Sequence, residues 1–279
     1  MENHQINLRL FFTATLILIL SASNNAQFFI LKKSPLNSAS VDLKFTHPVL
    51  KNNDFLNQYD QAIYSGSYDF DVSIPVSNSL NINILIPVSL IKNWNADSET
   101  DIGNIYLGVQ TKNQFSKIRS LRFSVGLFLP TASRETFLNN FSSYLINRYD
   151  PQKYFPNAFT LYLNWENRWD FRKGHIIKID VGGQGIVGVL GSGDVLFHYG
   201  FGGGFAFRDF LVLAEIAGIA VINSNSISFS DRFSNALSIG LNYGGHFIKP
   251  GIFYKFHLDD WTSDLDSGAF GFNIQFDFP

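Results

Sequence analysis

The chain has 279 residues, a formal net charge of −2, and no cysteine, so disulfides and thiolate metal sites are excluded. Charged residues make up only 16% of the chain, well below the roughly 25% usual in soluble domains. A near-neutral balance also argues against nucleic acid, whose binding needs a basic footprint.

The N-terminal stretch has the three-part pattern of a secretory signal. Arg9 precedes an apolar run from Leu10 to Leu20, and small or polar residues follow. This run is too short to span a bilayer, which takes about 20 apolar residues. We therefore expect residues 1–27 to be a signal peptide that is cleaved between Ser23 and Gln27. A buried N-terminal helix is the alternative.

The stretch Val195–Phe207 separates into two different faces, because alternate residues of a strand point to opposite sides. One face is largely aromatic and consists of Val195, Phe197, Tyr199, Phe201, Gly203, Phe205 and Phe207. The other is small and partly polar, and consists of Leu196, His198, Gly200, Gly202, Gly204 and Ala206. This contrast suits a wall with lipid outside and a crowded lumen inside.

Similar segments recur along the chain and give about twelve strands, an even number as in bacterial single-chain barrels. The predicted strands are Val41–Thr46, Tyr68–Val76, Leu80–Leu90, Ile105–Gln110, Leu121–Leu129, Phe159–Trp169, Ile176–Val189, Val195–Phe207, Phe210–Val221, Leu237–Gly244, Ile252–Leu258 and Phe270–Phe278. Tight connections alternate with longer polar ones such as Leu50–Ser67 and Ile91–Gly103, a rhythm that a soluble Greek-key sandwich would not produce. The sequence predicts an all-β fold, a transmembrane antiparallel up-and-down β-barrel over residues 28–279.

The run from Tyr68 to Ser133 contains YDFDVSIPVSNSLNINILIPVSLI, DIGNIYLGVQTKNQ and LRFSVGLFLPTAS. It resembles a family of bacterial outer-membrane transporter proteins named for the meta-pathway of phenol degradation, although Asn104 and Ala132 replace residues usual in that family. The resemblance covers about a quarter of the chain and supplies no site residues. It implies a β-barrel that passes small hydrophobic or aromatic compounds across the outer membrane of a Gram-negative bacterium. Phe278 matches the terminal aromatic residue of such barrels.

The inward faces of the predicted strands carry charges of both signs. We expect the lumen to be lined by Arg122, Glu166, Arg168, Lys178, Asp180, His198, Gly200, Gly202, Gly204, Glu215, Lys255 and Asp277. About eight strands give a filled barrel and sixteen leave a channel, so twelve falls between. A polar passage and a lumen packed by ion pairs are both open readings.

Two turns predict cross-strand partners in the lumen. The connection Asp170–Gly174 places Glu166 opposite Lys178, because a slide by two residues would face Arg168 with Lys178 and bring like charges together. The turn Arg208–Asp209 places Glu215 opposite Gly202. The inward glycines mark either close approach of a ligand or the curvature of the barrel.

The longest connection, Pro130–Asn157, is too apolar for a free tail. We expect it to fold, with a helical turn near Glu135–Leu145, and to cover the mouth of the barrel. Packing among surface loops is the alternative.

No cofactor or catalytic site is expected. Gly183–Gly188 matches G-x-G-x-x-G, but its glycines and valines disfavour the helix that a dinucleotide site requires. No serine lies two residues from any of the histidines that an outer-membrane lipase could use, namely His47, His175, His198, His246 and His257. The acidic loops around Asp97–Asp101 and Asp259–Asp266 could bind divalent cations, but they fit no EF-hand spacing, and a solvated acidic rim is the alternative.

The sequence thus favours a non-enzymatic outer-membrane barrel that lets small molecules pass. Its expected partners are the bilayer with its lipopolysaccharide leaflet and a small solute, and a monomer is the default. The alternative is a non-conducting structural or adhesive barrel whose long surface loops bind partners.

Overall fold

The computed structural model describes residues 38–50, 66–92, 98–133, 149–188, 193–223, 232–244, 247–259 and 266–278. Within these ranges the strands are β1 (Ala39–Leu50), β2 (Gly66–Ser77), β3 (Leu80–Lys92), β4 (Ser98–Ile102), β5 (Tyr106–Gln114), β6 (Arg119–Phe128), β7 (Phe159–Asp170), β8 (His175–Val187), β9 (Asp194–Phe207), β10 (Phe210–Val221), β11 (Phe233–Tyr243), β12 (Ile248–His257) and β13 (Asp266–Phe278). A short 3₁₀ helix, η2 (Pro151–Lys153), precedes β7. None of the helices in the described ranges is long and apolar enough to cross a membrane.

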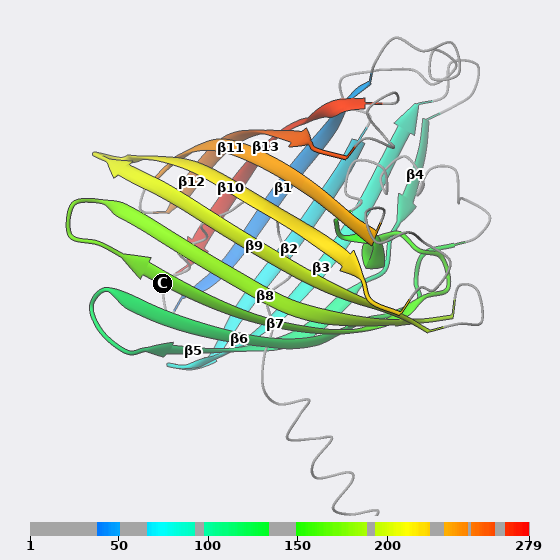
Figure 1. Ribbon diagram of the computed structural model, residues 1–279, viewed down its shortest axis with the longest axis horizontal. Coiled ribbons are helices and arrows are strands. Elements are labelled where there is room, and N and C mark those ends of the chain that lie inside the picture. Colours follow the sequence, from blue (N-terminus) through cyan, green and yellow to red (C-terminus); the bar gives the residue numbers. More distant parts are fainter. Residues whose placement is uncertain are drawn as a thin grey trace, which may run out of the picture.

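The strands form one antiparallel sheet that closes on itself (Figure 1). Closure is made by β1, which pairs with β2 on one side and with β13 on the other. Both β4 and β5 pair with β3, β4 along Val88–Lys92 and β5 along Leu80–Leu85. They therefore occupy one strand position of the barrel between them. The predicted fold, a transmembrane up-and-down barrel of twelve strands, is confirmed.

The two faces of each strand differ as the alternation predicts. On β9, Phe197, Phe201 and Phe205 are exposed on the outside, whereas His198 and Gly202 are buried on the inside. Apolar side chains outside and polar ones inside reverse the usual order of a soluble protein. The arrangement is stable because lipid surrounds the outer face.

The tight turns and the two ends of the barrel lie at one rim. The first residue of β1, Ala39, pairs with Phe278 at the end of β13, and the turn Arg208–Asp209 joins β9 to β10 at the same rim. The strand ends that border the long connections lie at the other rim. One predicted long connection, Ile91–Gly103, is largely strand instead, because β4 continues the β3 hairpin. The sequence of β4 shows no alternation of apolar and polar residues, so this strand is recognised only from its backbone pairing with β3.

The predicted register of β7 and β8 is wrong by two residues. Arg168 lies opposite Lys178, and Glu166 lies opposite Asp180. The turn decides this, because Gly174 has a φ of +83° and the N–H of Phe171 donates to the carbonyl of His175 at 2.8 Å. A short loop that ends in a left-handed glycine fixes the strand register.

Like-charge repulsion between Arg168 and Lys178 is offset because each pairs with a carboxylate two residues further along its own strand. The guanidinium of Arg168 contacts Asp170 at 2.7 Å, and the ammonium of Lys178 contacts Asp180 at 3.1 Å. The predicted register of β9 and β10 is confirmed, with Glu215 opposite Gly202.

The lipid-facing assignment of β9 predicts a dependence on depth. Phe201 lies at the middle of the strand and Phe207 at its end, and their exposed fractions are nearly equal, 56% and 57%. Phe201→Arg should destabilise the barrel by about 2–4 kcal/mol, and Phe207→Arg by about 0–1 kcal/mol, because a charge costs most at the bilayer midplane. Urea unfolding of barrels refolded into vesicles, followed by the gel-mobility shift of the folded form, measures both. Equal losses for the two variants would contradict a membrane-spanning β9.

Candidate functional site: the lumen and its inward segment

The residues predicted to line the lumen lie on the buried face of their strands. The nine charged or histidine side chains among them are at most 7% exposed, and they are Arg122, Glu166, Arg168, Lys178, Asp180, His198, Glu215, Lys255 and Asp277. Gly200 and Gly202 are buried, and Gly204 is half-buried. Each of these residues shares the inward side of its strand with other polar groups, opposite the apolar outer face.

Five of these side chains form one charged cluster, centred on Lys178. Its ammonium lies 3.1 Å from Asp180, 3.7 Å from Glu215 and 3.8 Å from Glu166. Arg122 contacts the other oxygen of Glu166 at 3.4 Å. The cluster spans β6, β7, β8 and β10, and it contains three carboxylates and two cations.

The inward glycines of β9 make room for this cluster. A Cβ on Gly200 would lie 2.7 Å from a carboxylate oxygen of Asp180, and one on Gly202 would lie 3.5 Å from Cγ of Glu215. The space over these glycines is therefore occupied by the chain's own carboxylates. Position 200 requires glycine because the side chain of Asp180 approaches it closely, and not only because the barrel is curved.

The remaining predicted residues lie apart from the cluster. His198 stacks on Tyr162 with ring centroids 4.9 Å apart, and its Nε2 lies 3.0 Å from Oδ1 of Asn164. Lys255 lies over the ring of Tyr149, 5.7 Å from its centroid. Asp277 pairs with Lys249 near the tight-turn rim.

A segment of the longest connection, Tyr149–Asn157, enters the lumen near the long-loop rim (Figure 1). Its residues from Tyr149 to Tyr154 are buried, whereas Phe155 is half-buried and Asn157 is exposed. We call this stretch the inward segment. The helical turn predicted near Glu135–Leu145 falls outside the described residues. In the described part of this connection, the helical element is η2.

The inward segment contacts the barrel wall on two sides. Lys153 lies 2.9 Å from Asp69 on β2 and 3.3 Å from Asp150. On the other side, the hydroxyl of Tyr149 donates to the backbone carbonyl of Asn235 on β11 at 2.7 Å. Burial alone would lower the pKa of Lys153, but the two carboxylates raise it above its ordinary value, so the ammonium keeps its charge at neutral pH.

Two short stretches form the clasp, which we define as Gly103 and Asn104 between β4 and β5 together with Thr131 and Ala132 just after β6. The Asn104 amide donates to the carbonyls of Gln152 at 2.9 Å and of Phe155 at 2.7 Å. Its oxygen accepts from the N–H of Ala132 at 3.0 Å, and Thr131 donates to the carbonyl of Gly103 at 2.6 Å. Two backbone hydrogen bonds add to these, from the N–H of Asn104 to the carbonyl of Lys153 at 2.7 Å and from the N–H of Asn157 to the carbonyl of Ala132 at 3.3 Å. The clasp thus ties the inward segment to the wall through both side-chain and backbone hydrogen bonds.

The sequence did not predict the clasp or the position of Lys153 in the lumen. Gly103, Asn104, Thr131 and Ala132 lie within the strings that carry the family resemblance, and that is the signal that could have singled them out. Gly103 approaches the carbonyl of Lys153 so closely that a Cβ would clash with it.

The other candidate chemistries find no assembled site in the described ranges. Gly183–Gly188 lies in and directly after β8, so no helix begins there. No group of three or more His, Asp or Glu side chains in these ranges is placed to hold a metal ion. Asp259 instead accepts hydrogen bonds from the N–H of Asn235 at 2.7 Å and the hydroxyl of Ser234 at 2.6 Å. The rest of the acidic stretch from Asp260 to Leu265 lies outside the described residues.

The charged cluster predicts a strong effect of removing its central cation. Lys178→Met leaves three buried carboxylates with only Arg122 among them, and it should destabilise the barrel by about 3–5 kcal/mol. Lys249→Met is the matched control, because Lys249 forms a single ion pair and is partly exposed, and it should cost about 0–1 kcal/mol. Urea unfolding in vesicles measures both variants. An equal, small loss would show that the cluster does not hold the wall together.

Comparison with known proteins supports the fold. No family model and no curated protein matches the sequence. An outer membrane channel from Pseudomonas putida F1 superposes with a TM-score of 0.58 at 10% identity, over 92% of this chain and 99% of that one. The NanC porin and the KdgM porin each have a TM-score of 0.49, at 10% and 9% identity, over 86% of this chain and 99% of theirs. The chain therefore shares the fold of bacterial outer-membrane β-barrels.

Proposed function

We propose that the protein is an outer-membrane channel for small molecules, and that the inward segment is its gate. One observation carries the proposal: a segment outside the strand ladder lies buried in a polar lumen, where side-chain contacts and two backbone hydrogen bonds hold it in place. Strand pairing must persist for the barrel to exist, whereas side-chain contacts can break while the barrel stays folded.

The wall of the lumen favours hydration over a dry, packed interior. The side chains of Ser124, Thr160 and Gln184 are buried on the inward face, and each has polar atoms that make no hydrogen bond within the protein. Buried polar groups are normally satisfied by protein or by water. A hydrated passage accounts for these groups, whereas a solid plug of ion pairs does not.

The contacts of the inward segment are of a kind that can be released together. They include the clasp, the ion pair between Lys153 and Asp69, and the hydrogen bonds of Tyr154 with Ser67 and of Tyr149 with Asn235. Two backbone hydrogen bonds, from Asn104 to Lys153 and from Asn157 to Ala132, complete them.

Aromatic side chains in the lumen bear on the class of solute. Tyr106, Phe128 and Tyr162 pack together with Leu85 on the inward face, at ring distances of 4.9–6.2 Å. They suit small hydrophobic or aromatic solutes, which is also what the family resemblance implies. In this proposal the protein acts as a monomer without enzymatic activity. Its long loops lie on the lipopolysaccharide side, and its tight turns face the periplasm.

Asn104→Leu tests the gate. It removes three hydrogen bonds of the clasp, which are together worth roughly 2–4 kcal/mol, and it should raise the open fraction by at least about tenfold. The measurement is single-channel recording in planar bilayers. The matched control is Asn223→Leu, because Asn223 also bonds backbone groups at a loop, Val195 and Gly193, but does not touch the inward segment.

The control should conduct like the unmodified protein. If Asn104→Leu folds, by the gel-mobility shift, and conducts no better than the unmodified chain, the gate is rejected. If no variant conducts at all, passage itself is rejected in favour of a structural or adhesive barrel.

A further inference from the structure

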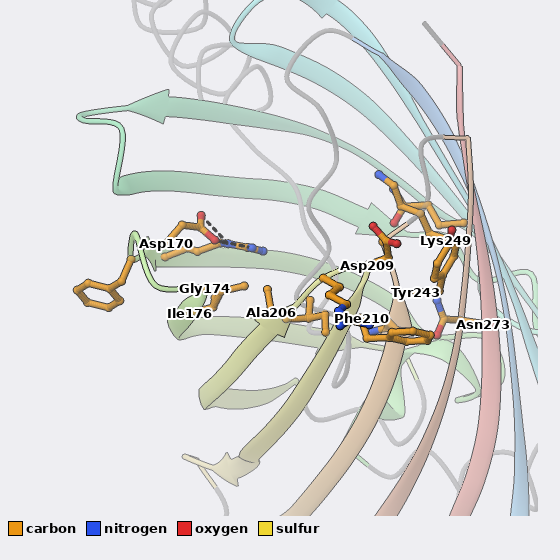
Figure 2. A pocket seen from close by; sticks show the side chains of 16 residues that line it. Asp170, Gly174, Ile176, Ala206, Asp209, Phe210, Tyr243, Lys249 and Asn273 are labelled. Carbon is orange, nitrogen blue, oxygen red and sulfur yellow. Dashed lines mark hydrogen bonds and ion pairs between the residues drawn. The ribbon is translucent and has the colours of Figure 1, made fainter.

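The lumen opens into a pocket at the tight-turn rim, with a volume of about 370 Å³ (Figure 2). Figure 2 shows Gly174, Ile176 and Ala206 on one side of it and Tyr243, Lys249 and Asn273 on the other. This volume is in the range of sites that bind small molecules, which is about 300–1,000 Å³. The pocket lies at the opposite end of the barrel from the inward segment.

One wall of the pocket is apolar. Ile176 on β8 and Leu211 on β10 line it, and both belong to a packed group with Leu213. Ala206 on β9 lies between them with its small side chain. At this rim the inward faces of the other strands are mainly polar.

The facing wall is made of amides. Asn242 on β11 and Asn273 on β13 flank Gly251 on β12, and both amide oxygens lie so close over Gly251 that a Cβ there would clash with them. Gln275 continues the row. The side-chain oxygen of Asn242 is buried and accepts no hydrogen bond within the protein. A buried acceptor of this kind calls for a donor.

Charges of the two signs balance around the pocket, where the turn residues Arg208 and Asp209 contribute one of each and the others are paired. Arg168 makes a bidentate pair with Asp170, with its Nε at 3.1 and 3.0 Å from the two carboxylate oxygens. On the other side Lys249 pairs with Asp277, which also accepts from Gln275. The lining therefore offers no excess of either charge to a charged ligand, and a neutral ligand leaves both ion pairs intact.

We propose that this pocket binds an uncharged amphipathic solute with a single hydroxyl group. The hydroxyl donates to the side-chain oxygen of Asn242, and the apolar body lies against Ile176 and Leu211. The proposal rests on the proposed function, in which the pocket is a binding site at the periplasmic end of the passage. Binding can nevertheless be measured without any flow of ions or solute.

Ligand-detected NMR with the folded barrel in micelles provides the first test. The probes are 2-phenylethanol, which is neutral, and two charged molecules of similar size, phenylacetate and 2-phenylethylammonium. Ala206→Phe fills the pocket and should weaken binding of 2-phenylethanol by at least about tenfold. Ala214→Phe on the lipid-facing side of β10 is the matched control, and it should bind like the unmodified chain. Both variants are first checked for folding by the gel-mobility shift.

Asn242→Leu separates the amide contact from simple partitioning. The substitution should weaken the binding of 2-phenylethanol by about five- to tenfold, the effect of one hydrogen bond. The binding of ethylbenzene, which has no hydroxyl group, should not change. Equal binding by Ala206→Phe and the unmodified chain would overturn the proposal, as would tighter binding of either charged probe. A barrel that binds 2-phenylethanol as expected but conducts nothing would refute the channel and leave the pocket standing.

Discussion

The structure depends on one constraint, the hydrogen bonding of every backbone N–H and C=O group that lies in the bilayer. No water is present there to satisfy an open sheet edge, so a membrane-spanning sheet must close. The chain meets this demand where β1 pairs with both β2 and β13. Closure then decides the destination of every side chain, because alternate residues must face either lipid or the lumen.

That division crowds the lumen, and glycine relieves the crowding at chosen points. The ring of Tyr106 lies against Gly126, His198 lies against Gly182, and Asp180 lies over Gly200. In each of these three cases, a glycine on a neighbouring strand makes room for a large inward side chain. The charged cluster and the aromatic group can both fit inside twelve strands for this reason, and the inward segment lies in the lumen near the long-loop rim.

The strands and their faces could be predicted because both follow from local alternation, as in Val195–Phe207. The register of β9 and β10 followed from a two-residue turn, whereas that of β7 and β8 was missed because Gly174 makes a longer turn with a left-handed residue. The clasp could not be predicted in this way. Asn104 bonds Gln152, 48 positions along the chain, and no local pattern reports a contact at that separation.

The central claim is that the inward segment must move for solutes to pass. The chain has no cysteine, so a pair of introduced cysteines can be cross-linked selectively. Ser67→Cys and Tyr154→Cys replace two side chains that contact each other between β2 and the inward segment. Conductance is measured in planar bilayers before and after treatment with a short thiol-specific bifunctional reagent. The account predicts that cross-linking abolishes the conductance of the double variant and leaves each single variant unaffected. Undiminished conductance through the cross-linked barrel would contradict it.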